Sequence, residues 1–346
     1  MDNKMWLEIQ EQPDVIRNCL TANEEKLNQI ADVVKNKNIK YIVAAARGSS
    51  DHAAVYGKYM IEILSGYPVV LSAPSVFTVY GASMKFEDAL VLGISQSGEA
   101  EDILSVLRAA KAYGAPTVGI TNEPESPIAK EVDCCLDCSA GQEKSVAATK
   151  TFTAQMCLLG MLAIKLSGNK EDEKLFAKIP EQISAVFGMA EKIQSKAVQY
   201  CFAEDMIVLG RGLEYCIALE SALKVEETTY VRAKGFAASD FYHGPIAVVH
   251  AGLPILTYAM SGPAMENMRD LIKQLMDIGA NVLVVSDNEK VCHLGTDFIL
   301  LPPACSFLTA PFMDAVTAQL FAFYLSKAKK LDPDNPRLLH KVTITH

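Results

Sequence analysis

The sequence predicts an α/β protein built from two tandem copies of one three-layer unit, each with a parallel sheet covered by helices on both faces. From Lys40 onward, short apolar strands alternate with amphipathic helices, a pattern typical of parallel sheets. Three motifs also recur 164 residues apart (211 − 47, 261 − 97, 317 − 153): Arg47-Gly48 and Arg211-Gly212, Ser97-Gly98 and Ser261-Gly262, Thr153-Ala154-Gln155 and Thr317-Ala318-Gln319. One fixed offset indicates an internal duplication.

The composition agrees with two ordinary globular domains. The 346 residues are 50% hydrophobic, which is enough for two full cores. The net charge, 32 basic minus 41 acidic residues, is −9 and argues against non-specific nucleic-acid binding. Nine cysteines, most of them single in apolar segments, are typical of reduced thiols. The start lacks the form of a signal peptide, and the apolar run 156–164 is too short for a membrane span. We therefore expect a soluble cytoplasmic protein.

The elements follow in order along the first half. Residues 1–36 predict a helical arm, in which Pro13 suits a helix start. The first domain is expected over residues 37–168, with strands at 41–46, 69–72, 90–94 and 117–121 and helices at 51–64 and 99–112.

The second half is joined to the first by residues 169–198, a predicted helical connection that begins with a charged loop at 169–174. The second domain is expected over residues 199–334, and residues 335–346 form a tail.

The turn Ser95-Gln96-Ser97-Gly98 lies between a buried strand and an amphipathic helix. Hydroxyls and backbone N–H groups at a helix N-terminus favour an anion, so this turn is a candidate phosphate cradle. The alternative is that Ser97 is a plain N-cap with Glu101 in the first turn. The second copy, Ser261-Gly262-Pro263, lacks the glutamine and one serine and carries a proline where a donor stood, which favours the cradle.

Two further polar turns in the first half, at 48–52 and 144–150, follow or precede predicted elements. Each alone is typical of a helix cap. Because ligands of open α/β sheets bind beyond the carboxyl ends of the strands, three such turns together predict a pocket of sugar-phosphate size.

Reactive side chains of the second half lie between Arg211 and Pro245. Glu220, Lys224 and Glu227 share one helix face, and by spacing alone an exposed ladder worth about 0.2–0.5 kcal/mol per pair is the favoured interpretation. His243 precedes Gly-Pro in a turn, and with Glu227 and a lysine it could supply the acid, base and cation for proton transfer beside a carbonyl.

The cysteine cluster at 134–138 lacks a second pair with zinc-like spacing and reads as a strand, so no metal site is expected.

Taken together, these motifs resemble the double sugar isomerase (SIS) domain family. The residues that carry the resemblance are the duplicated unit, the turn 95–99, Leu209-Gly-Arg-Gly212, the helix 217–227 and His243-Gly-Pro245. The nearest forms are the isomerase half of glucosamine-6-phosphate synthase and the SIS-type glucosamine-6-phosphate deaminases. The resemblance covers essentially the whole chain and implies that the two domains are SIS domains, with the tail 335–346 over the active site.

The resemblance also implies the substrate-binding residues. Side chains of Ser50, Ser95, Gln96 and Ser97 would hold the substrate phosphate, and the backbone at Val146 and Ala147 would line the sugar.

For catalysis, the resemblance implies that Glu227 moves a proton between C1 and C2, His243 helps ring opening, and Lys224 and Lys341 support an enediol-like intermediate. No metal or nucleotide cofactor is expected. Because the synthase's histidine comes from the partner subunit, the resemblance implies a homodimer with a shared active site. No nucleic-acid or membrane partner is expected.

The sequence departs from the synthase at three places: Ala100 and Ala148 replace hydroxyl residues, and Ser239-Asp240 replaces Gly-Glu. The runs 48–52 and 341–343 are closer to the deaminases. The chain begins Met-Asp, without the N-terminal cysteine of a glutaminase domain. The expected reaction is conversion of glucosamine 6-phosphate to fructose 6-phosphate and ammonia. The alternatives are a deglycase acting on an amino-acid-linked sugar phosphate and a non-catalytic phosphosugar sensor.

Overall fold

The computed structural model describes residues 3–339 and 341. These residues form two compact units, each described here by itself. The sheet-1 unit comprises residues 14–143, 150–177 and 341, and the sheet-2 unit comprises residues 3–13, 144–149 and 178–339. The domain boundaries derived from the sequence stay a prediction, and the predicted tail falls partly on residues 340 and 342–346, which lie outside the described residues.

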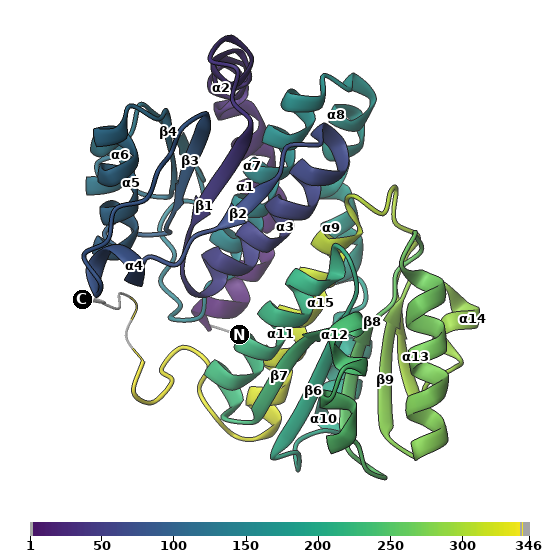
Figure 1. The fold of residues 1–346 in the computed structure, drawn as a ribbon. Helices are drawn as coiled ribbons and strands as arrows, with labels where there is room; N and C mark the ends of the chain where they lie inside the picture. The colour runs from purple at the N-terminus through teal and green to yellow at the C-terminus, as the bar shows by residue number, and fades with distance from the viewer. Residues whose placement is uncertain (1–2, 340, 342–346) are drawn as a thin grey trace. The chain divides into compact units, whose positions relative to one another are not determined.

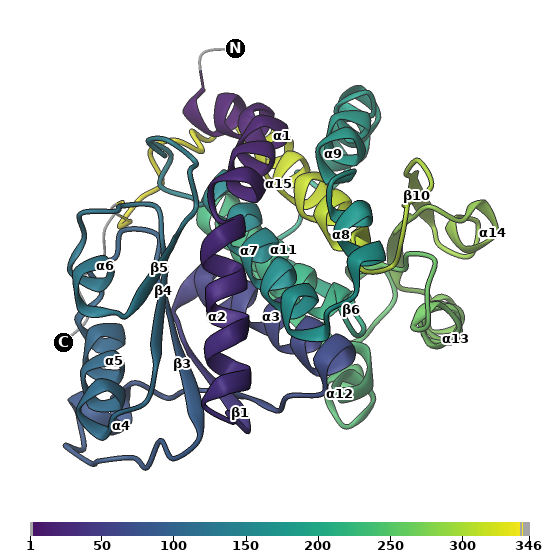
Figure 2. The ribbon, with the colours of Figure 1, turned by 90° about the horizontal axis from the view of Figure 1, so that it is seen from above.

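The sheet-1 unit contains five parallel strands in the order β2-β1-β3-β4-β5. Figure 2 shows one group of helices on each face of this sheet, α5 and α6 on one and α2, α3 and α7 on the other. The bounds are β1 Tyr41–Ala45, β2 Val69–Leu71, β3 Ala89–Ile94, β4 Thr117–Thr121, β5 Cys134–Asp137, α2 Glu24–Asn36, α3 Gly48–Ser65, α4 Ser75–Thr78, α5 Glu101–Tyr113, α6 Pro127–Glu131, α7 Lys150–Ser167 and α8 Lys170–Phe176.

The sheet-2 unit contains five parallel strands in the order β10-β9-β8-β6-β7 (Figure 1). Apolar side chains of α12, α13 and α14 form one core with β6, β8 and β9, while α11 packs against β6, β7 and α15. The bounds are β6 Asp205–Gly210, β7 Arg232–Ala237, β8 Pro254–Tyr258, β9 Asn281–Ser286, β10 Asp297–Leu300, α9 Ile179–Phe187, α10 Ala190–Val198, α11 Glu214–Thr229, α12 Ala238–Tyr242, η1 Pro245–Val248, α13 Met265–Ile278, α14 Glu289–Cys292 and α15 Ala310–Ala328.

The two sheets repeat one topology. Raising each strand number of the first sheet by five gives the order of the second. The starts of β1 and β6 are 164 residues apart (205 − 41), as are those of β4 and β9 (281 − 117). The prediction of two tandem α/β copies with parallel sheets is therefore confirmed.

Two local predictions are wrong. Helix α1 (Lys4–Ala22) begins nine residues before Pro13 (13 − 4), which lies inside it, because packing of the long helix tolerates one missing backbone hydrogen bond. The charged segment 169–174 is not a loop, since it enters α8. Asn169 caps that helix through a hydrogen bond from Glu171 N, and three acidic residues lie in its first turn, where the helix dipole favours them.

Helix α7 holds the apolar run 156–164, and all of these residues are buried. Within the described part of the chain, no helix has the length and apolar character required to cross a membrane.

Candidate active site

The turn after β3 is closed by its own hydroxyls. Ser95 Oγ accepts a hydrogen bond from Gly98 N at 3.2 Å, and Ser97 Oγ accepts one from Glu99 N at 3.3 Å. Helix α5 begins at Glu101, and its N-cap is Ala100, which makes no side-chain cap hydrogen bond. The interpretation of Ser97 as a helix cap is therefore wrong. Its hydroxyl accepts a hydrogen bond within the turn, and the residue precedes the N-cap position, Ala100, by three residues (100 − 97).

Gly98 is required by the shape of this turn. Its φ of +64° lies in the left-handed region, where glycine is favoured. A Cβ at this position would overlap the Ser126 side chain and lie 2.9 Å from Thr121 Oγ1. The turn thus packs directly against the residues that follow β4.

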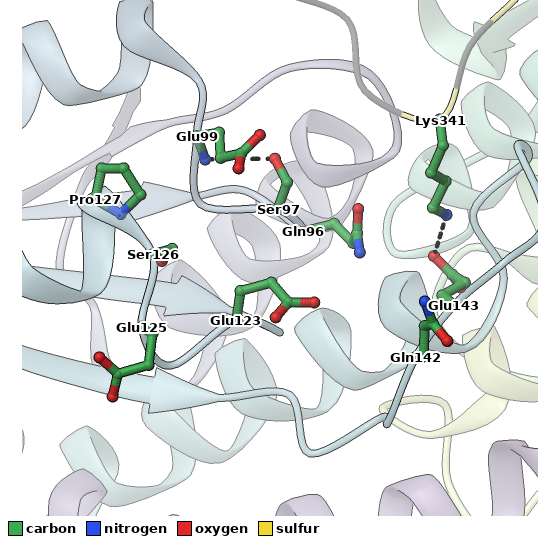
Figure 3. A pocket seen from close by; sticks show the side chains of 10 residues that line it. All are labelled: Gln96, Ser97, Glu99, Glu123, Glu125, Ser126, Pro127, Gln142, Glu143 and Lys341. Atoms are coloured by element: carbon green, nitrogen blue, oxygen red, sulfur yellow. Dashed lines mark hydrogen bonds and ion pairs between the residues drawn. The ribbon is translucent and has the colours of Figure 1, made fainter.

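A pocket of about 400 Å³ opens beside this turn, entirely within the sheet-1 unit (Figure 3). It brings together three of the predicted site residues, Gln96, Ser97 and Lys341. The described residues that line it are Gln96, Ser97, Glu99, Glu123, Glu125, Ser126, Pro127, Gln142, Glu143 and Lys341.

Ser50 and Ser95 are not among the residues that line this pocket. Ser50 is buried in the first turn of α3, and Ser95 is buried at the end of β3. Arg47, just before α3, donates to the buried carboxylate of Asp102 in α5 at 2.8 Å. This ion pair ties the turn after β1 to the helix that follows β3, two neighbouring strands of the sheet.

Lys341 reaches the pocket through an ion pair with Glu143. Its Nζ donates to Glu143 Oε2 at 2.9 Å, and Thr151 donates to the same carboxylate from Oγ1 at 2.8 Å and from its backbone N at 3.2 Å. The Glu143 side chain is 0% exposed and that of Lys341 is 26% exposed. The lysine is therefore held by a carboxylate whose orientation is fixed by the first turn of α7.

The charge of the pocket is acidic for a phosphate site. Of its ten described lining residues, Lys341 has the one cationic side chain, whereas Glu99, Glu123, Glu125 and Glu143 are acidic. A phosphate in this pocket would depend on neutral donors, such as hydroxyl, amide and backbone N–H groups, together with Lys341.

The third predicted turn belongs to the sheet-2 unit, where Glu8 of α1 holds it. The buried Glu8 carboxylate accepts hydrogen bonds from the backbone N of Lys144 and from that of Ser145, the latter at 3.1 Å. Val146 is half-buried and Ala147 is buried. The N-terminal helix therefore fixes the backbone that was predicted to line the sugar.

Helix α11 places Glu220, Lys224 and Glu227 together. Lys224 Nζ lies 3.4 Å from Glu220 Oε1 and 2.5 Å from Glu227 Oε2. The Lys224 and Glu220 side chains are 0% and 1% exposed, and Glu227 is 21% exposed. An exposed ladder, which spacing alone favoured, is therefore wrong, because α11 is buried on this face as well. Burying two charged groups beside a third, partly exposed one is costly, so such a cluster is a candidate functional site.

His243 lies at the C-terminal end of α12, before Gly244, whose φ is +139°. Its side chain is exposed, and among the described residues its imidazole makes no hydrogen bond. The structure thus joins Lys224 to Glu227 but joins His243 to neither.

In the second copy, the turn equivalent to residues 95–98 donates a hydrogen bond to a carboxylate that follows β9. Asp287 accepts hydrogen bonds from Ser261 N at 2.8 Å and from Ala304 N at 3.2 Å. Glu214, the counterpart of Ser50 (214 − 164), is buried, and burial together with the Asp287 charge raises its pKa to about 8 against an opposing backbone hydrogen bond. The position of Ser50 in the first copy is thus occupied by a buried acid in the second.

The described residues contain no group of three or more His, Cys, Asp or Glu side chains arranged to hold a metal ion.

Sequence reasoning gave no role to two residues that the structure places beside predicted ones. Glu143 lies one position before the turn at 144–150. The feature of the sequence that could have indicated it is a carboxylate directly before a polar turn that precedes a helix. Glu220 was recognised on the face of the lysine, and only its burial shows that it matters.

Two parallel sheets of one strand order, each followed by polar turns, define a tandem α/β protein with its ligand site beyond the strands. A family model described as the SIS domain matches residues 35–165 and 202–327, and the chain belongs to this family. The family predicted from the motifs is confirmed.

The relatives that show the family are enzymes. The chain is 35% identical over 354 residues to the glutamine–fructose-6-phosphate aminotransferase [isomerizing] of Gloeobacter violaceus, covering 97% of this chain and 58% of that protein. It is 34% identical over 343 residues to the enzyme of the same name from Aquifex aeolicus, covering 99% and 57%. The chain thus spans little more than half the length of these curated relatives.

Among solved structures, the C-terminal domain of glucosamine-fructose-6-phosphate aminotransferase from Francisella tularensis superposes with a TM-score of 0.89 at 25% identity. The superposition covers 97% of this chain and 99% of that one.

Proposed function

We propose that the chain is a phosphosugar isomerase of the SIS family that acts as a deaminase, converting glucosamine 6-phosphate and water to fructose 6-phosphate and ammonia. The names of the relatives support a fructose 6-phosphate skeleton. Transfer of nitrogen from glutamine, which those names include, is not part of the proposal.

The observation that carries the proposal is the pairing of Lys224 with Glu227 on α11. A carboxylate that is partly exposed beside a buried ammonium can take a proton from a ligand while the cation stabilises the negative charge that develops. In the proposed reaction, Glu227 removes the proton from C2 of the open-chain amino sugar and returns a proton to C1. The resulting imine at C2 is hydrolysed by water, which releases ammonia.

Phosphate binding is assigned to the turn after β3 and to its neighbours. Gln96 and Ser97 line the pocket with Lys341, and we include Ser50 and Ser95 as phosphate ligands with the backbone of Val146 and Ala147 beside the sugar. A hydroxyl-rich turn next to a helix N-terminus supports an anionic group here.

His243 is proposed to assist ring opening as a proton donor and acceptor. Its exposed position supports a role at a site shared between the two subunits of a homodimer. Lys341 and Lys224 are proposed to stabilise the enediol-like intermediate. Unpaired cysteines throughout the chain support a reducing compartment such as the cytoplasm.

A deglycase acting on an amino-acid-linked sugar phosphate would use the same proton chemistry, and the four carboxylates around the pocket suit the cationic amine that this substrate shares with glucosamine 6-phosphate. The third hypothesis is a non-catalytic sensor. The cluster of Glu220, Lys224 and Glu227 argues against it, because ligand binding alone does not require so costly an arrangement of charges.

One assay separates these functions. Purified protein is incubated with glucosamine 6-phosphate and ammonia is measured, beside an amino-acid-linked sugar phosphate with release of the amino acid as readout. Ammonia from the first supports the deaminase, and amino acid from the second supports the deglycase. Binding without turnover of either would refute an enzyme, and an unchanged rate in Glu227→Gln would refute the assigned base.

A further inference from the structure

Glu143 lines the pocket, and its buried carboxylate meets the ammonium of Lys341 (Figure 3). Two hydrogen bonds from Thr151 hold the carboxylate independently of the lysine, because the backbone N and Oγ1 of that residue belong to the start of α7. The carboxylate is therefore held from the protein side, and the lysine is the partly exposed partner of the pair.

The ion pair differs from surface pairs in its surroundings. The Glu143 side chain is fully buried, whereas Lys341 keeps part of its surface toward the pocket. An ammonium has three donors, so the bond to Glu143 leaves others for a ligand beside Gln96 and Ser97. A charge-assisted hydrogen bond to a buried acceptor is directional, which fixes the position of the charge.

We propose that Glu143 is a positioning residue for the reaction: it holds the Lys341 ammonium in the phosphate pocket, at the place where the charge stabilises the reaction intermediate. This inference rests on the proposed function, in which Lys341 acts on that intermediate. In this proposal the effect of Glu143 on turnover passes through Lys341.

The test is a double-mutant cycle of Glu143→Gln and Lys341→Met, read in the kcat and KM for glucosamine 6-phosphate. Glu143→Gln keeps the shape and removes the charge, and we expect kcat to fall about tenfold, the usual size of coupling between contacting residues, with a smaller change in KM. In the Lys341→Met background the same change should cost nothing further. Equal losses of kcat in both backgrounds, or a rise in KM alone, would overturn the proposal.

A matched control is Glu173→Gln, which breaks another ion pair of the sheet-1 unit, Lys165 to Glu173 at 2.8 Å, outside the pocket. Its kcat should equal that of the wild type. Should Glu143→Gln fail to fold, Thr151→Val removes one of the hydrogen bonds that hold the carboxylate and leaves the charge. Its smaller loss of kcat should also vanish in the Lys341→Met background, and a loss that persists there would overturn the proposal.

Failure of the proposed function would look different. If the wild type releases no ammonia, the deaminase is refuted, and the cycle is then read in the calorimetric affinity for fructose 6-phosphate. Non-additive losses of affinity would still support the positioning of Lys341 by Glu143. Additive losses, or no binding of the sugar phosphate by the wild type, would overturn it.

Discussion

The raised pKa of Glu214 predicts that the free energy of unfolding of the chain falls as the pH rises. Burial, helped by the nearby charge of Asp287 and opposed by a backbone hydrogen bond, raises its pKa from 4.5 to about 8. Between these pH values the Glu214 carboxyl keeps a proton in the folded chain that it loses in the unfolded chain. The contribution of this group to the free energy of unfolding is therefore fully present below about pH 4.5 and is lost as the pH rises toward 8. The shift of 3.5 units (8 − 4.5) corresponds to a ceiling of about 5 kcal/mol at about 1.4 kcal/mol per unit.

The perturbation is Glu214→Gln, which keeps the shape and cannot ionise. Relative to the wild type, the free energy of unfolding of the variant should rise by a few kcal/mol from pH 5 to pH 8. The sole tryptophan, Trp6, packs against Phe323 and Tyr324 in the sheet-2 unit, so its fluorescence during urea unfolding reports the unit that contains Glu214.

The control is Glu204→Gln, an exposed glutamate of the same unit, for which the difference from the wild type should stay within about 0.5 kcal/mol at every pH. If the difference between Glu214→Gln and the wild type is the same at pH 5 and at pH 8, the carboxyl does not hold its proton in the folded chain and the reasoning is refuted.

Three further changes have defined outcomes. Gly98→Ala should raise the KM for the sugar phosphate and lower the free energy of unfolding by more than Gly66→Ala does. Gly66 has open space around it, so its substitution carries only the strain of a positive φ, about 1 kcal/mol. Equal urea midpoints for the two variants would contradict this prediction. Lys224→Met leaves two carboxylates without their cation, so it should lower the free energy of unfolding by about 3–5 kcal/mol and abolish turnover. The matched change in an exposed ion pair, Lys174→Met, should lower it by only about 0.5 kcal/mol. Glu123→Gln removes a negative charge from the pocket and should lower KM at low salt, an effect that 0.5 M salt should erase; an unchanged KM would show that this carboxylate lies too far from the phosphate.

The fold was predictable because its signals are local and repeated. Buried strands such as β3 (Ala89–Ile94) are uninterrupted runs of apolar or small residues, and the 164-residue offset links the two copies without any knowledge of packing. Helix α8 was missed because its sequence is almost entirely charged, so its helical character rests on capping and on the dipole.

The candidate site was predictable in its residue types and less so in its environment. Spacing shows that Lys224 and Glu227 share a helix face. Burial of α11 depends on β7, which follows it directly, and also on α15, which packs against it from a distant part of the chain. The role of Glu143 required the contact with a lysine 198 residues further along the chain, a distance that no local pattern encodes.

The interleaving of the two units restricts how such a protein can be divided or recombined. Along its length the chain passes between them five times, after residues 13, 143, 149, 177 and 339. A cut between the two copies, at 177/178, would leave residues 3–13 and 144–149 on a fragment that lacks the rest of their unit. That fragment would also lack Asp334, whose carboxylate accepts hydrogen bonds from the backbone N–H groups of Lys4 and Met5. A division at the boundary of the repeat therefore removes two backbone segments, residues 3–13 and 144–149, from the unit to which they belong.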